Sequence, residues 1–340
     1  MSARTFIAEG LVPWHPVSIR RSWPGLALAT VIALAATFVS TAYGGPQLLY
    51  ALFFGLAFHW LWDDPACRPG IQFCSQTLLR SGIALMGVRV TWDQVASLGA
   101  GTLAMVLVAV ASTILFGALA AHLLGRPRCQ GLLSGGAVAI CGASAAMAIS
   151  AVLPQNKENE QFTLLTVVGV TTLSTIAMVL YPLLVHYFAL DTTAAGIFIG
   201  ATIHDVAQAV GAGYLVSPHT GDVAVVVKLT RVACLVPVLV AVAGHYRRRG
   251  GIGGAPSLPL FLGGFALLMM ANSAHLVPPV LAQTLGNASR AFLVMSIAAL
   301  GIKTSFQALA SLGFKPVLML VSETVWIAAL VMVTVRWHAV

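Results

Sequence analysis

Long apolar stretches follow one another along almost the whole chain, and short polar turns separate them. A helix needs about 20 apolar residues to cross a hydrocarbon core of ~30 Å, and it satisfies its own backbone hydrogen bonds there. The residue-by-residue alternation typical of an outer-membrane barrel is not seen. The pattern predicts an all-α polytopic membrane protein with about 10–11 transmembrane helices. The candidate spans lie at about 25–41, 47–62, 76–90, 99–123, 132–153, 162–188, 194–216, 223–245, 258–277, 288–306 and 315–336.

Composition supports the membrane class. Of the 340 residues, 59% are hydrophobic and only 8% are charged, and the mean hydropathy is +0.92. A water-soluble domain of this length could not carry such a surface. We expect a cytoplasmic N-terminal tail over 1–24 and one transmembrane domain over 25–336. Its two halves would cover about 25–190 and 191–336, with a Gly- and Arg-rich linker at 246–257.

The formal net charge of +8 invites a nucleic-acid interpretation, but the positions of the positive residues argue against it. With the N-terminus in the cytoplasm, the internal segments hold far more Lys and Arg than the external ones, as the positive-inside rule requires. We therefore expect a cytoplasmic N-terminus, an external C-terminus and no nucleic-acid partner. The internal residues are Arg4, Arg20, Arg21, Arg68, Arg80, Arg126, Arg128, Arg247, Arg248, Arg249, Lys303 and Lys315; the external ones are Arg89, Lys157, Arg290 and Arg336.

The five cysteines predict neither a disulfide framework nor a metal site. Cys67, Cys74 and Cys129 map to the internal side, where thiols stay reduced. Cys67 and Cys74 also lack the spacing of zinc ligands. We expect no metal and no cofactor.

An internal repeat links two distant segments. Residues 81–99 and 295–313 share seven identities in nineteen aligned positions, including an Ala-Ser-Leu-Gly run at the end of each copy. The two copies fall at opposite ends of their predicted spans, so the sequence predicts an inverted structural repeat, an architecture typical of secondary transporters. A weaker match between 139–150 and 201–212 places two segments in the same orientation, so either the topology is permuted or one of them does not fully cross.

Small residues are dense in the span at 132–153, which contains Gly135-Gly136 and then Cys141, Gly142, Ala143 and Ser144. Glycines weaken a helix, and a break near the membrane midplane would leave free N–H groups facing an anion. We expect a broken helix and substrate contact here. Close helix packing through small residues is the alternative.

The span at 194–216 carries His204, Asp205 and Gln208 inside apolar surroundings. Ionisable groups at membrane depth cost several kcal/mol, so they usually mark ion or substrate paths. Asp205 and Gln208 are three residues apart and could pair locally. We expect a proton- or ion-coupling site, and a polar knot that holds helices together is the alternative.

Lys228 and Arg231 lie three residues apart in the next span and should project together. Two positive charges would attract an anion, and the guanidinium fork suits oxyanions. In the alternative interpretation, Lys228 pairs with Asp205 while Arg231 caps helix carbonyls. Glu323 is a further polar residue within a predicted span, and we expect it to pair with one of the basic groups.

Taken together, SGIALMGVRV, AVAICGASAAMAISAVLP, TIHDVAQAVGAGY, VKLTRVACLVPV and ALGIKTSF resemble the YeiH-like family of conserved bacterial inner-membrane proteins, often called sulfate exporters. The resemblance covers about residues 25–336 in order and spacing. It implies a ten- or eleven-helix carrier, loosely similar to the bile acid/sodium symporter and cation/proton antiporter group, with helices that break and cross at the substrate site. The matching positions are Cys141, Gly142, Ala143, Ser144, His204, Asp205, Gln208, Lys228 and Arg231.

These observations predict a secondary transporter of a small anion, such as sulfate, sulfite or a related sulfur oxyanion, coupled to protons or ions. Lys228, Arg231, Ser144 and amides near Gly142 would bind the anion, and His204 with Asp205 would handle the proton. A sodium/proton antiporter with Asp205 as cation ligand is the alternative. An intramembrane enzyme with Cys141 or Ser144 as nucleophile is a remote one. The expected partners are the anion and the bilayer. Whether the protein forms a homodimer is left open.

Overall fold

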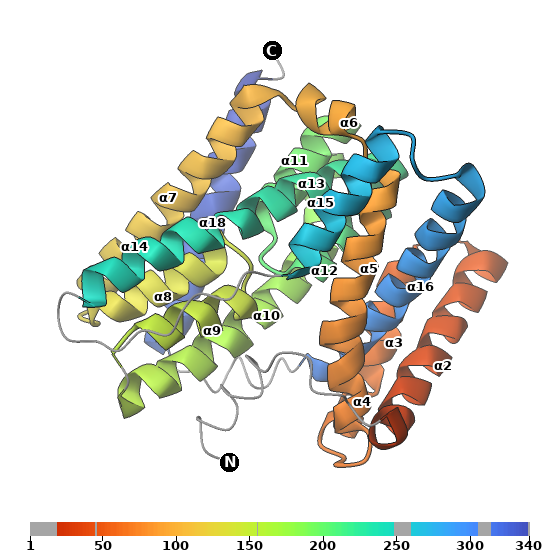
Figure 1. Cartoon of the computed structure of the whole chain (residues 1–340). Coiled ribbons are helices and arrows are strands. Elements are labelled where there is room, and N and C mark those ends of the chain that lie inside the picture. The colour runs from red at the N-terminus through yellow and green to blue at the C-terminus, as the bar shows by residue number, and fades with distance from the viewer. Residues whose placement is uncertain (1–18, 45, 155, 248–259, 305–313, 339–340) are drawn as a thin grey trace.

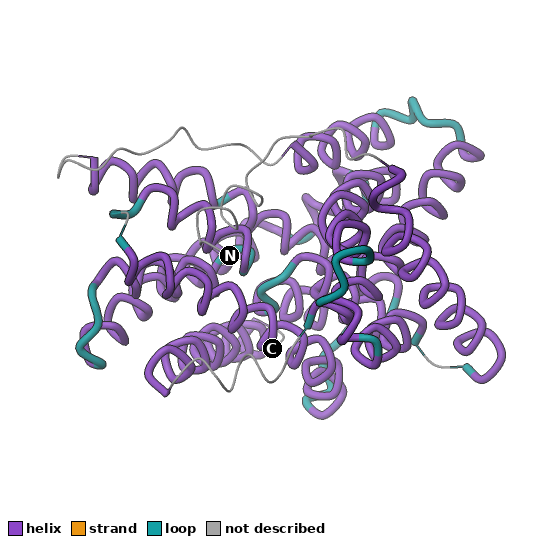
Figure 2. The backbone as a smooth tube through the Cα atoms, turned by 90° about the horizontal axis from the view of Figure 1, so that it is seen from below, coloured by secondary structure: helices purple, strands orange, loops and turns teal. Residues whose placement is uncertain are grey.

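The computed structural model describes residues 19–44, 46–154, 156–247, 260–304 and 314–338. Within these ranges all regular structure is helical (Figure 2). Among the described residues, six helical stretches are long and apolar enough to cross a membrane. They are Arg21–Tyr43 in α2 (Ile19–Tyr43), α7 (Gly99–Leu123), α10 (Lys157–Tyr187), Pro218–Tyr246 in α13 (Pro218–Ala233) with α14 (Leu235–Arg247), α16 (Pro279–Lys303), and Phe314–Trp337 in α18 (Phe314–His338). The predicted all-α polytopic architecture is confirmed.

Other predicted spans are shorter or composite. The span predicted at 47–62 consists of α3 (Gln47–Ala57) and the 3-10 turn η1 (His59–Trp62). The next one is built from α4 (Arg68–Phe73), the π-helix η2 (Cys74–Leu78), α5 (Leu79–Met86) and the 3-10 turn η3 (Gly87–Arg89). A short α6 (Trp92–Ser97) then leads into α7, and α15 (Leu260–Ser273) corresponds to the span predicted at 258–277.

The two spans rich in small or polar residues are each broken. The span predicted at 132–153 consists of α8 (Arg128–Ala139) and α9 (Ala143–Val152). The span predicted at 194–216 consists of α11 (Thr192–Thr202) and α12 (Val206–Val216). The prediction of broken helices is therefore confirmed, and both breaks fall on the residues that the sequence singles out.

The helices pack as two bundles (Figure 1). The scaffold bundle consists of α2, α3, α4, α5, α15 and α16; the crossing bundle consists of α7 to α14 and α18. Helix α12 packs on α3 and α16 and so joins the two bundles. Each predicted half of the chain contributes to both bundles, because α15 and α16 return to pack on α5. Most of the predicted linker at 246–257 lies outside the described residues, as do residues 305–313 at the end of the second repeat copy.

Glycine allows α3 and α16 to approach closely within the scaffold bundle. A Cβ atom on Gly55 of α3 would lie 2.2 Å from the carbonyl oxygen of Ala298 in α16, and one on Gly301 would lie 2.4 Å from the Leu52 carbonyl. No larger side chain fits between these backbones. Such small-residue contacts hold helices together in lipid, where burial of apolar surface gives little driving force.

Candidate functional site

Each broken helix stops and restarts within three residues. Helix α8 gives way at Ile140, whose φ and ψ angles of −110° and −82° are not helical, and α9 restarts after Gly142 at φ 63°. A positive φ with this geometry favours glycine. In the second break, Ile203 and Asp205 are both extended. The break thus leaves the last carbonyl groups of α8 and α11 without partners in their own helices.

Lys228 supplies one set of partners. Its Nζ donates to the carbonyl oxygens of Ile140 and Ile203, each at 2.8 Å. The side chain is completely buried. One ammonium group therefore bonds the ends of both broken helices.

Arg231 supplies the other set. Its Nε donates to the Ala139 carbonyl oxygen at 2.7 Å, and its Nη2 donates to the Val138 oxygen at 2.7 Å. Its Nη1 donates to the carbonyl oxygens of Gly200 and Ile203 at 3.2 and 3.0 Å. The guanidinium is also fully buried. We call this region, where the two breaks lie against Lys228 and Arg231, the crossing.

Lys228 and Arg231 project together, as their spacing predicts. Their hydrogen-bond partners are carbonyl oxygens of the broken helices. Arg231 adopts the capping role of the alternative interpretation. Lys228 does the same, and among the described residues it forms no ion pair with Asp205. Because a helix C-terminus carries about half a negative charge, two buried cations are well placed between two such ends. Direct contact of either cation with a substrate stays a prediction.

The two restarting helices differ at their N-termini. Asp205 caps α12, since its Oδ1 accepts a hydrogen bond from the Ala207 amide at 2.8 Å. The cap residue of α9 is Gly142, which has no side chain for this purpose. Ser144 in the first turn of α9 is exposed, Asp205 is half-buried, and Cys141 is buried. The N-terminus of α9 therefore has no side-chain cap. It lies among the predicted residues Cys141, Gly142, Ala143 and Ser144.

His204 is fully buried and bonds Thr324 of α18 through Nε2 at 2.9 Å. The Thr324 hydroxyl donates its one hydrogen to the Leu320 carbonyl at 2.6 Å, so it accepts from the imidazole. Nδ1 has no hydrogen-bond partner among the described residues. No hydrogen bond joins it to Cys141 or Ser144 within that part of the chain.

Gln208 is also fully buried at the crossing. Its Nε2 donates to Thr175 of α10 at 2.7 Å, and Thr175 lies 3.4 Å from the hydroxyl of Thr304 at the end of α16. Its Oε1 has no hydrogen-bond partner in the described residues. The sequence favours a pair between Gln208 and Asp205, but the Gln208 side chain bonds Thr175 instead. The backbone amide of Asp205 donates to the Ser174 hydroxyl at 2.9 Å.

Sequence reasoning assigned two cations of the scaffold bundle only to membrane orientation. Arg80 of α5 is exposed. Lys303 of α16 is half-buried, interacts with the charge of Asp205 and lies 5.5 Å from the Trp62 ring. Both fall inside predicted spans, and that position was the signal for a functional role.

Glu323 of α18 is fully buried against α7 and α8. Its Oε1 accepts a hydrogen bond from Ser134 at 2.7 Å, and its Oε2 has no hydrogen-bond partner within the described ranges. The expected ion pair with a basic residue is not formed there.

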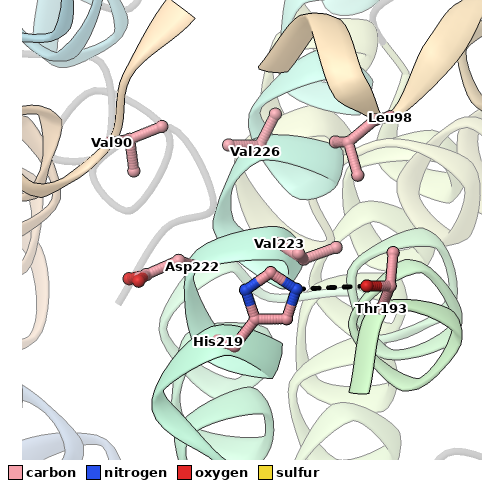
Figure 3. A pocket seen from close by; sticks show the side chains of 7 residues that line it. All are labelled: Val90, Leu98, Thr193, His219, Asp222, Val223 and Val226. Carbon is pink, nitrogen blue, oxygen red and sulfur yellow. Dashed lines mark hydrogen bonds between the residues drawn. The ribbon is translucent and has the colours of Figure 1, made fainter. Parts of the chain in front are cut away.

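A separate cavity of about 160 Å³ lies near the N-terminal end of α13 (Figure 3). His219 is turned toward Thr193, with 3.1 Å between Nε2 and the hydroxyl oxygen. Asp222 accepts a hydrogen bond from Tyr214, and the Arg89 guanidinium lies 5.8 Å from the Tyr214 ring. The polar groups here satisfy one another, whereas the crossing has buried acceptors without partners among the described residues.

A helical protein with several apolar spans, two broken helices and buried cations at their ends is a polytopic membrane protein. The chain matches the family described as Conserved hypothetical protein 698 over residues 24–320 and belongs to it. It is 46% identical to a UPF0324 membrane protein of Chlorobaculum tepidum, covering 98% of this chain and 95% of that one. It is 44% identical to the UPF0324 membrane protein TauZ of Paracoccus denitrificans, covering 94% and 96%, and 32% identical to the UPF0324 inner membrane protein YeiH of Salmonella typhi, covering 92% of each. No solved structure matches. The predicted family membership is confirmed.

Proposed function

We propose that the protein is a secondary transporter that carries a small anion by alternating access, with the substrate bound at the crossing. The observation that carries this proposal is the shared capping of α8 and α11 by Lys228 and Arg231. Discontinuous helices whose ends meet are the usual substrate site of secondary transporters.

The charges at the crossing favour an anion. Lys228 and Arg231 contribute two positive charges against about one negative charge from the two helix C-termini. The N-termini of α9 and α12 add about one positive charge, and Asp205 removes one, so a positive excess of about one remains. The exposed Ser144 and the first amides of α9 offer hydrogen-bond donors to the solute.

The same charges weigh against the alternatives. A sodium ion at the crossing would face two fixed cations, which disfavours the sodium/proton antiporter. A nucleophile–histidine pair is not supported by the bond from His204 to Thr324. Asp205 is the better candidate for coupling, because it is half-buried and titratable, with Gln208 and His204 beside it.

The direct test is uptake of labelled sulfate and of labelled sulfite into proteoliposomes, with an imposed proton gradient. Wild-type protein should accumulate one of these anions, and Ser144→Ala should weaken its uptake. Arg126→Ala is the matched control, because the half-buried Arg126 forms an ion pair with the exposed Glu158 at 3.7 Å. Sodium-driven proton flux that is indifferent to every anion would replace this proposal with the antiporter.

A further inference from the structure

We propose that Glu323 of α18 is a second proton-binding site of the transporter, in addition to Asp205, and that it carries its proton in this structure. The proposal rests on the proposed transport function and adds a coupling proton to it. The site lies outside the crossing, where α18 packs on α7 and α8.

Glycines make room for the Glu323 carboxyl group between α7 and α8. The two helices approach closely there, since a Cβ atom on Gly131 would lie 2.3 Å from the Gly117 carbonyl oxygen. A Cβ atom on Gly117 would lie 2.8 Å from Glu323 Oε1. Trp326 stacks on Phe116 with ring centroids 4.8 Å apart, which fixes α18 on α7. The carboxyl group is therefore enclosed by three helices, and Glu323 is fully buried.

The hydrogen bonding of this carboxyl group favours the protonated form. Ser134 Oγ lies 2.7 Å from Glu323 Oε1 and 3.4 Å from the Gly131 carbonyl oxygen, so its hydrogen goes to Oε1. Oε2 is buried and has no hydrogen-bond partner among the described residues. Burying an unpaired charge costs far more free energy than burying a neutral polar group. The enclosed group is therefore the carboxylic acid.

No ion pair compensates an ionised Glu323 within the described part of the chain. Helix α18 packs on α7, α8, α10 and α11, and α11 contains no titratable residue. On the other helices, α18 included, most titratable residues lie near the helix ends: His122, Arg128, Cys129, Lys157, Glu158, Glu160, His186, Tyr187, Lys315, Arg336 and His338. Tyr181 of α10 packs on Phe198 instead. From the crossing, His204 reaches the next residue, Thr324.

Glu323 is connected to both broken helices. Its partner Ser134 lies about one turn before Val138, whose carbonyl oxygen bonds Arg231 at 2.7 Å. Its chain neighbour Thr324 bonds His204 at 2.9 Å. Loss of the proton leaves an unpaired charge, so the anionic form requires α18 to separate from α7 and α8 and admit water. The proton then passes to that water, and the separation moves groups bonded to both breaks.

The first test is the infrared spectrum of the protein in proteoliposomes at neutral pH, where a protonated carboxyl group has its own C=O stretching band. Glu323→Gln keeps the size of the side chain and cannot titrate, so it should remove this band. Glu160→Gln, which removes a half-buried carboxylate near the start of α10, is the control and should leave the band unchanged. Ser134→Ala should shift the band to higher frequency, because the carbonyl loses its hydrogen bond.

The second test is uptake of labelled sulfate and sulfite with and without an imposed pH gradient. Glu323→Gln should lose the accumulation that the gradient drives, because one coupling proton is no longer carried. Uptake down a concentration gradient should persist, since the crossing is unchanged. Glu160→Gln should behave as wild type in both conditions.

The outcomes separate the proton site from the transport function. An infrared spectrum unchanged in Glu323→Gln, or full gradient-driven accumulation in this folded variant, overturns the proposal while the transporter stands. If the wild-type protein transports neither anion, the proposed function fails, and a band that Glu323→Gln removes still assigns a bound proton to Glu323. If Glu323→Gln does not fold, Ser134→Ala decides, and an unshifted band then overturns the proposal.

Discussion

The two broken helices share their C-terminal chemistry and differ at their N-termini. Lys228 and Arg231 bond the last carbonyl groups of both α8 and α11. Beyond the break, α12 begins with the carboxylate of Asp205, whereas α9 begins with Gly142 and the exposed Ser144. The positive N-terminus of α12 thus has a carboxylate beside it, and the N-terminus of α9 has none. In the proposed transporter, the titratable group and the helix end that receives the solute are therefore separate.

The largest effect should follow loss of the shared cap. Arg231→Ala leaves four helix-end carbonyl oxygens at the crossing without this donor group, and breaking a buried charged contact costs about 3–5 kcal/mol. We expect a large fall in melting temperature and in the yield of folded protein. Thermal unfolding in detergent, with Arg126→Ala as control, measures it. Normal stability with lost anion uptake would instead make Arg231 a substrate ligand.

The break between α8 and α9 should require Gly142 for its backbone conformation, and not because a larger side chain would clash. Gly142→Ala places a Cβ only in ordinary contact, with the nearest atoms at 3.6 Å, so the penalty comes from the backbone at φ 63°. We expect a loss of about 1–3 kcal/mol in the free energy of unfolding. Gly101→Ala in α7, with open space around it, is the control. A neutral Gly142→Ala would mean that α9 can restart with another geometry.

Substitutions of Asp205 should distinguish its role as the cap of α12 from its role as a titratable charge. Asp205→Asn keeps an oxygen for the Ala207 amide, so its stability should stay near that of wild type, whereas Asp205→Ala should lose about 1 kcal/mol. Both variants should lose proton-coupled accumulation, because neither can titrate. Uptake with and without a pH gradient measures this loss. Retained proton coupling in Asp205→Asn would assign the coupling to another residue.

Ser144→Ala should give the smallest change. Loss of one neutral hydrogen bond is worth about 1 kcal/mol, or about a fivefold rise in the KM for the anion. Stability should hold, because the Ser144 side chain is exposed. An unchanged KM would limit the α9 contribution to its backbone amides.

The sequence predicted the fold class and the break within 132–153, because dense glycine disturbs a helix locally. For 194–216 it singled out His204 and Asp205 but did not place a break there. It also predicted that Lys228 and Arg231 project together. It gave carbonyl capping for Arg231 only as the alternative and could not say which carbonyl groups are capped, since oxygens some 90 residues earlier, at Ala139 and Ile140, carry no side-chain signal. Lys303 lay inside a predicted span and was assigned to orientation, because only folding brings α16 beside α12. The inverted repeat and the orientation of the termini stay predictions.

The capping geometry constrains how the molecule can move. A single turn of α13 bonds the ends of two helices, α8 and α11, at one point, so neither of them can slide independently without exposing bare carbonyl groups to hydrocarbon. Any displacement that delivers cargo to the opposite side has to carry these segments as one block. In the proposed transporter, the sliding surface would be the contact of α12 with α3 and α16.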